Sequence, residues 1–186
     1  MRKFRYTGLT ILAIVALAIT SISYAKPPKM QTVTTHKFVE DAAKGGMAEV
    51  QLGQLAVQKA SSPDVKNFGQ RMIDDHSKAN NELKDLASRK SMTIPTAVDP
   101  KDKATMDRLS KLSGKAFDRA YMDDMVKDHE KDVAEFRNEA SNGKDADIKS
   151  WASKTLPTLE DHLKMAKTTY AKLSPAKKMR RTRKSK

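Results

Sequence analysis

The sequence predicts an all-α protein in which four long helices form two hairpins, joined by a long crossover that carries one short extra helix. Three observations predict this arrangement. Apolar residues recur at three- and four-residue steps along the chain. No segment alternates apolar and polar residues as a strand would. The stretch near residue 64 also resembles the stretch near residue 147.

The first 25 residues have the composition of a secretory signal peptide. Three positive charges in MRKFRY precede the apolar run GLTILAIVALAITSI, and the small residues Ser23 and Ala25 follow. We therefore expect a signal peptide at residues 1–25, with cleavage after Ala25. The apolar run falls short of the roughly 20 residues that span a bilayer, and an uncleaved membrane anchor is the alternative.

The chain contains no cysteine. Disulfides therefore cannot stabilise the exported protein, so its core must suffice, and a lipid anchor on cysteine is excluded. Together with the short signal peptide, this composition predicts an exported bacterial protein of the periplasm. Association with the outer membrane is an open extension of that prediction.

Two helices form the predicted first hairpin. The first runs over residues 38–59 and contains glycines, among them Gly45 and Gly53, that allow a neighbouring helix to approach closely. Ser62 is suited to cap the second helix and Pro63 to begin it. An amphipathic apolar stripe then continues along the second helix.

The second hairpin follows a long connector. The segment SMTIPTAVDPKDK, with two prolines, leads to a short helix expected at residues 104–112. A long helix is expected at residues 115–140, the turn SNGKDAD follows, and the last helix runs over residues 148–173. The helical domain thus covers residues 35–173.

The two halves of the chain repeat weakly. PDVKNFGQRMIDDH can be laid on ADIKSWASKTLPTLEDH with a three-residue insertion, which places His76 over His162. In the first helices of the two halves, Glu49 falls within one position of His129. Two similar hairpins joined by a long crossover are the layout of a ferritin-like four-helix bundle.

Each of the four long helices carries one ionisable residue on its apolar stripe. A buried charge without a partner is costly, so these groups must satisfy one another or bind something else. Three imidazoles and one carboxylate would suit one divalent transition metal ion, such as iron, zinc, manganese or copper. The candidate metal ligands are Glu49, His76, His129 and His162.

Each of the three inward histidines directly follows an aspartate. On a helix, this aspartate lies at the edge of the buried stripe, where it could accept the second N–H of an imidazole on a neighbouring helix. Carboxylates in this position orient metal-bound histidines. The candidate supporting residues are Asp75, Asp128 and Asp161.

The alternative to a metal site is a structural network in which histidines, aspartates, Glu49 and Tyr121 bond to one another. A di-iron oxidase is not supported, because no helix places a carboxylate three residues before its histidine. No cysteine, GxSxG motif or phosphate-binding glycine loop is present, so nucleophilic catalysis has no candidate residues. Whether the protein is an enzyme stays open.

The basic charge of the chain is concentrated at its C-terminal end. Of the formal charge of +13, three positive charges belong to the signal peptide and seven to the last ten residues, which leaves +3 for the rest. We expect residues 174–186 to form a disordered tail that binds an anionic envelope surface, lipopolysaccharide or phospholipid headgroups, rather than nucleic acid. A tail that only increases solubility is the alternative. The basic residues are Lys177, Lys178, Arg180, Arg181, Arg183, Lys184 and Lys186.

Four segments closely resemble the domain of unknown function 4142 family: GGMAEVQLGQLA, SPDVKNFGQRMIDDHSKANNELKDLA, LSGKAFDRAYMDDMVKDHEKDV and TLPTLEDHLKMA. The resemblance covers about residues 35–173. It implies an exported bacterial protein with a ferritin-like helical bundle, often labelled an outer-membrane protein, and it implies no particular activity. The family pattern adds Asp118 and Tyr121 to the candidate supporting residues.

Three functions fit these observations. The first is a non-enzymatic envelope protein whose helices form a scaffold and whose tail docks to anionic surfaces. The second is a metal-binding protein with a redox or stress-protective role. The third is a pH-responsive protein, because buried imidazoles that become charged in acid would destabilise the core. The first needs the fewest assumptions and the second is the more specific.

Overall fold

The computed structural model describes residues 29–173, which contain five helices and no strand. The predicted all-α fold class is therefore confirmed. The predicted signal peptide at residues 1–25 and the predicted basic tail at residues 174–186 lie outside the described residues. The helices are α1 (Lys29–Lys59), α2 (Pro63–Arg89), α3 (Pro100–Ser110), α4 (Gly114–Asn142) and α5 (Ala146–Leu173).

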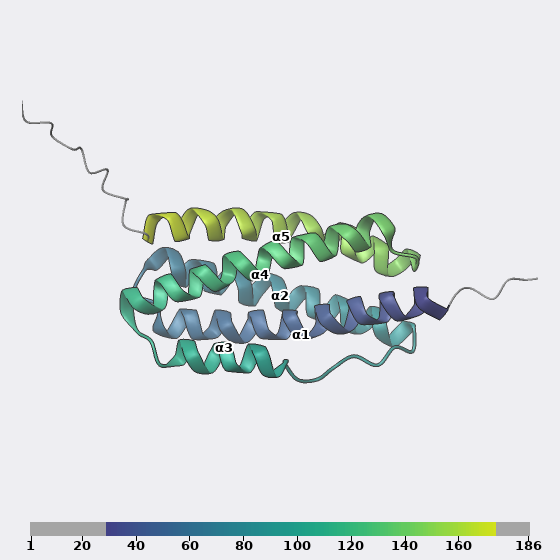
Figure 1. The fold of residues 1–186 in the computed structure, drawn as a ribbon, viewed down its shortest axis with the longest axis horizontal. Coiled ribbons are helices and arrows are strands. Elements are labelled where there is room, and N and C mark those ends of the chain that lie inside the picture. Colours follow the sequence, from purple (N-terminus) through teal and green to yellow (C-terminus); the bar gives the residue numbers. More distant parts are fainter. Residues whose placement is uncertain (1–28, 174–186) are drawn as a thin grey trace, which may run out of the picture.

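The four long helices lie side by side along the length of the molecule (Figure 1). Helix α1 packs along α2, and α4 packs along α5, so each pair is a hairpin. The two hairpins contact each other through α2 with α5 and through α1 with α4, while the short α3 lies against α1 and α4. Within residues 29–173, no helix has the length and apolar character needed to cross a membrane.

Two helices begin earlier than the sequence predicts. Helix α1 begins at Lys29 rather than at residue 38, and α3 begins at Pro100 rather than at residue 104. At α3, Pro100 marks the start of the helix, because proline lacks only an N–H that the first turn does not use. The sequence-based prediction assigned Pro100 to the connector and so placed this start too late.

The start of α2 is capped by a residue of another helix and not by the predicted Ser62. Ser62 precedes Pro63 as predicted, but its side chain makes no capping hydrogen bond. Instead, the carboxylate of Asp118 on α4 accepts hydrogen bonds from the backbone N–H groups of Ser61 and Ser62, and from the Ser61 hydroxyl. A charged acceptor at a helix N-terminus is favourable, and this one also joins the two hairpins.

Helices α1 and α2 cross closely at two glycines. A Cβ atom on Gly53 would lie 2.6 Å from the backbone oxygen of Gly69, and a Cβ on Gly69 would lie 2.9 Å from that of Gly53. Any larger residue at either position would push the helices apart. The predicted role of glycine in close packing thus holds at Gly53 but is wrong at Gly45, where an added Cβ would meet nothing within 4 Å.

The interior consists of two apolar cores with a polar layer between them. On each of α2, α4 and α5, one histidine separates a residue of one core from a residue of the other. The first core contains Leu52, Ala56, Ala60, Val65, Phe68, Met72, Leu109, Phe117, Tyr121, Met122, Met125 and Ala166. The second core contains Val39, Ala43, Leu83, Leu86, Val133, Phe136, Ile148, Trp151, Ala152 and Leu159.

Candidate metal centre

Three histidines from three helices meet in the layer between the cores. His76 on α2, His129 on α4 and His162 on α5 are 6%, 0% and 0% exposed. One ring nitrogen of each lies within 4.8 Å of those of the other two. The ring centroids are 5.4 to 5.8 Å apart. The structure therefore brings together three of the four predicted metal ligands, and we call them the histidine cluster.

The protonation of His129 follows from its hydrogen bond. Its Nδ1 lies 2.9 Å from the backbone oxygen of Met125, one turn earlier on α4. Because a carbonyl oxygen can only accept, Nδ1 carries the proton of the neutral ring. Nε2 then holds a lone pair, and this buried nitrogen has no hydrogen-bond partner among the described residues.

His162 is fixed by a carboxylate on another helix. Its Nε2–H donates to Asp75 on α2 at 2.8 Å, and Asp75 also accepts from Nε of Arg71 at 2.7 Å. Burial alone would raise the pKa of Asp75, but the two hydrogen bonds outweigh it and hold that pKa below its ordinary value. Asp75 is thus an ionised acceptor. The lone pair of His162 is on Nδ1, which is buried and has no hydrogen-bond partner in the described part of the chain.

His76 completes the cluster, with its Nε2 also buried and unpartnered among the described residues. Burial lowers the pKa of all three histidines, well below the ordinary value for His76 and to about 4 for His129. For His76, the other two rings add to this effect. All three rings are therefore neutral at pH 7, the state in which imidazole binds a metal.

These residues fit a nitrogen-bound metal ion. Metal-binding histidines commonly donate their other ring N–H to a carboxylate or a backbone carbonyl, which is the arrangement of His162 and His129. Metal–nitrogen distances of about 2.0–2.1 Å place ligand nitrogens roughly 3.3–3.6 Å apart. Small rotations of the rings would bring the observed spacing of up to 4.8 Å into that range.

Glu49 does not join the histidine cluster. It is 3% exposed, as an inward residue should be, but its carboxyl group lies on the far side of His129, with Oε1 3.9 Å from Nδ1. Burial, together with the charges of Asp132, Asp128 and Asp102, raises the pKa of Glu49 well above its ordinary value. Burial thus favours the uncharged form of this carboxyl group.

Only one of the five predicted supporting residues contacts the histidine cluster by a hydrogen bond, and that residue is Asp75. Asp128 lines a pocket with Glu49, and Asp161 is exposed. Asp118 is occupied at the start of α2, about 16 Å along α4 from His129 at 1.5 Å per residue. The hydroxyl group of Tyr121 is buried without a partner among the described residues.

Sequence reasoning missed a second group of carboxyl groups, next to Glu49. Asp102 and Asp132 line the same pocket as Asp128. Burial raises the pKa of Asp132 to about 7, and the neighbouring Asp128 adds to that effect. The four-residue spacing of Asp128 and Asp132 predicts a shared helix face and could have revealed half of this group. Asp102 could not have been assigned, because it is on α3, far away in the sequence.

Residues 20–169 match the family described as domain of unknown function (DUF4142). The chain belongs to this family. None of the curated proteins is similar enough in sequence to match it. The resemblance found in the sequence motifs is thus confirmed, and the family description supplies no activity.

Solved structures with similar folds include two kinds of protein. One is a DUF305 fragment from Deinococcus radiodurans, with a TM-score of 0.67 at 12% identity, covering 75% of this chain and 96% of the fragment. The other is CopM, solved with Cu(I) bound (TM-score 0.65, 18% identity, 76% and 98% coverage) and with Cu(II) bound (TM-score 0.64, 18% identity, 75% and 97% coverage). At these identities the similarity establishes the helical fold alone.

Proposed function

We propose that this protein is an exported copper-binding protein that holds one copper ion between His76, His129 and His162. The observation that carries the proposal is the set of three buried ring nitrogens that have no hydrogen-bond partner within residues 29–173. Each unpaired buried polar atom costs about 1–3 kcal/mol. A metal ion that binds all three nitrogens would remove that cost.

The composition of the site favours copper over harder metals. The cluster offers nitrogen ligands only, which suit copper and zinc, whereas manganese prefers oxygen. The surroundings are apolar on both sides, and a low-charge ion such as Cu(I) is the least costly to bury there. CopM, which shares the fold, has been solved with Cu(I), Cu(II) and silver bound.

The protein's own residues would hold the copper ion in place. The Asp75 carboxylate fixes the tautomer and orientation of His162, and Arg71 fixes Asp75. The Met125 carbonyl does the same for His129. A bound copper ion supplies a one-electron redox couple, and its burial would limit reaction with outside molecules. Storage or detoxification of copper in the cell envelope suits such a closed site.

Metal analysis of the purified protein, prepared without an affinity tag, tests this proposal. The protein would be dialysed against Cu(I) under anaerobic conditions, and separately against Cu(II), Zn(II) and Mn(II), and bound metal measured by elemental mass spectrometry. We expect one copper ion per chain, weaker binding of zinc and no binding of manganese. His76→Ala and His162→Ala should abolish binding, and Asp75→Asn should weaken it by about 10- to 100-fold.

His36→Ala is the matched control, because His36 is an exposed histidine outside the cluster. It should leave copper binding unchanged. If the protein takes up no copper and shows no thermal shift with any of these metals, the metal proposal is wrong. The histidines would then be a structural network.

The helical architecture and the location of the protein in the cell are also part of this proposal. We propose that the paired hairpins form a ferritin-like four-helix bundle, supported by the packing of α1 with α2 and of α4 with α5. We further propose that the protein works in the periplasm, associated with the outer membrane through its basic C-terminal residues. The seven basic residues without an acidic one among the last ten support that attachment.

A further inference from the structure

A small cavity reaches His76 from the side of α1 and α4. Its volume is about 30 Å³, and its lining includes His76, Trp151, Gly45 and Asp132. A cavity needs a volume of at least about 10–15 Å³ to hold a single water molecule. The cavity can therefore hold a water molecule or a small ion next to the histidine cluster.

A larger pocket of about 330 Å³ is lined by residues of α1, α3 and α4 and of the segment before α3. The two spaces adjoin, because Asp41, Gly45, Asp132 and Glu135 line both. We call the two adjoining spaces the acidic port.

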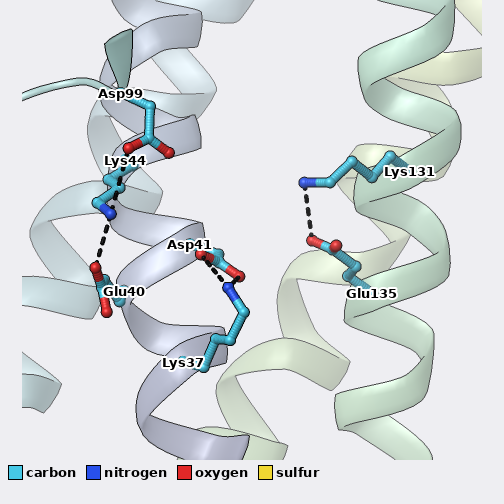
Figure 2. Close-up of polar contacts among 7 residues, drawn as sticks. All are labelled: Lys37, Glu40, Asp41, Lys44, Asp99, Lys131 and Glu135. Carbon is cyan, nitrogen blue, oxygen red and sulfur yellow. Dashed lines mark hydrogen bonds and ion pairs between the residues drawn. The ribbon is translucent and has the colours of Figure 1, made fainter. Parts of the chain in front are cut away.

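The charges of the acidic port are of two kinds. At its rim, carboxylates are matched by lysines: Asp41 with Lys37, Asp99 with Lys44, and Glu135 with Lys131. Figure 2 shows these ion pairs on α1, on the segment before α3 and on α4, the elements that border the pocket.

Deeper in the acidic port, the carboxyl groups lack such partners. Asp102, Asp128 and Asp132 line it without a hydrogen bond or ion pair to any described residue, although Lys101 also lines the pocket. Glu49, which also lines the pocket, has a buried carboxyl oxygen with no hydrogen-bond partner among residues 29–173. A cation that enters would therefore meet carboxyl groups that form no close ion pair with a described residue, although Lys101 and Lys131 act on them from a longer distance.

Gly45 keeps the passage open. It lines both spaces, and an added Cβ there would meet nothing within 4 Å. Its neighbour Gly46 differs, because a Cβ there would lie 2.0 Å from the side-chain oxygen of Asn80. The Asn80 side chain therefore restricts the space at position 46, whereas at position 45 a side chain would project into free space.

We propose that the acidic port is the route by which a metal cation reaches the histidine cluster, with Asp128 and Asp132 as its first binding site and Gly45 as its opening. The proposal rests on the copper site proposed above. The carboxylates attract the hydrated cation, and the cavity passes it to the free nitrogen of His76. Affinity then comes from the histidines, and the rate of loading comes from the port.

Stopped-flow fluorescence with Cu(II) sulfate tests this route in the whole protein. Trp151 is the only tryptophan of the chain and lines the cavity, so its quenching by Cu(II) reports arrival of the ion. Gly45→Leu should slow quenching by about tenfold or more, with an equilibrium copper content equal to that of the unchanged protein. Asp128→Asn with Asp132→Asn should slow loading by about tenfold at low salt and reduce its dependence on ionic strength.

Asp161→Asn is the matched control. Asp161 is exposed beside His162 and lines a different pocket, so its removal should leave the rate unchanged. If Gly45→Leu does not fold, the aspartate double variant and its salt dependence decide the question. Equal loading rates in the unchanged protein and in the folded port variants would overturn the route while leaving the copper site intact. An unchanged protein that binds no copper would instead refute the proposed function.

Discussion

The two apolar cores and the histidine cluster between them are built from the same helices but affect the stability of the fold in opposite ways. Core side chains such as Phe68 and Leu83 are 1% exposed and bury only carbon, which stabilises the fold in proportion to the apolar area removed from water. The histidines are also buried, yet each leaves a ring nitrogen without a hydrogen-bond partner among the described residues. In the metal-free protein, these unpaired nitrogens cost stability, and the proposed copper ion would remove that cost.

The largest effect is expected from a large-to-small substitution in an apolar core. Leu83→Ala should lower the free energy of unfolding by about 3 kcal/mol, because it removes buried methyl groups and leaves a cavity. Urea denaturation followed by circular dichroism measures this change. Lys154→Ala is the control: its ion pair with Glu82 is exposed, so its removal should change stability by less than about 0.5 kcal/mol. Equal losses in both variants would contradict the assigned core.

A second prediction concerns acid and the metal-free histidine cluster. The pKa of His129 is about 4 in the folded protein and about 6.5 in the unfolded chain. The unfolded state therefore binds more protons between these values. As a result, this ring does not reduce the free energy of unfolding above pH 6.5, and it reduces it progressively as the pH falls from 6.5 to 4. Relative to the unchanged protein, His129→Gln should thus gain about 3 kcal/mol between pH 7 and pH 4.

The matched control has the opposite sign. The pKa of Asp132 is raised to about 7 in the folded protein, so the folded state binds the extra proton and the unchanged protein gains stability from this group as the pH falls from 7 toward 4. Asp132→Asn should therefore lose stability relative to the unchanged protein as the pH falls from 7 to 4. Urea titrations in the presence of a chelator measure both differences. Parallel pH curves for the unchanged protein and His129→Gln would contradict the buried, neutral state of that ring.

The smallest effect is expected within the histidine cluster at neutral pH. His76→Leu replaces an unpaired buried nitrogen by carbon, so the metal-free protein should keep its stability or gain about 1 kcal/mol. Copper should stabilise only the unchanged protein, by about 2.7 kcal/mol at a free concentration of 100 Kd. Thermal denaturation with and without copper measures both. A loss of 2 kcal/mol or more in the metal-free variant would show that His76 is mainly structural.

The sequence predicts the elements and the inward faces well, because both depend on local periodicity. The four-residue step from Met72 to His76, and again from Met125 to His129, is enough to assign these rings to the interior. The aspartate before each histidine also suggested a contact between neighbouring helices, and the bond from His162 to Asp75 is such a contact.

The depth of a side chain in the domain, and the rotation of one helix relative to its neighbour, could not be predicted from the sequence. A helical pattern gives the face of Glu49 but not its position around His129, and the carboxyl group lies on the outer side of that ring. Asp118 similarly follows the inward pattern, but its partners are backbone groups at the turn between α1 and α2. Such partners carry no sequence signal, because any residue supplies a backbone N–H.

The contact of Asp118 has a consequence for how the domain opens. A carboxylate of the second hairpin holds the turn of the first, so the first hairpin cannot fray at that end without leaving a buried charge unpaired. The two hairpins should therefore open and close as one cooperative unit rather than as two independent halves. The turn between α1 and α2 therefore links the stability of one hairpin to that of the other, so damage at this turn should weaken both.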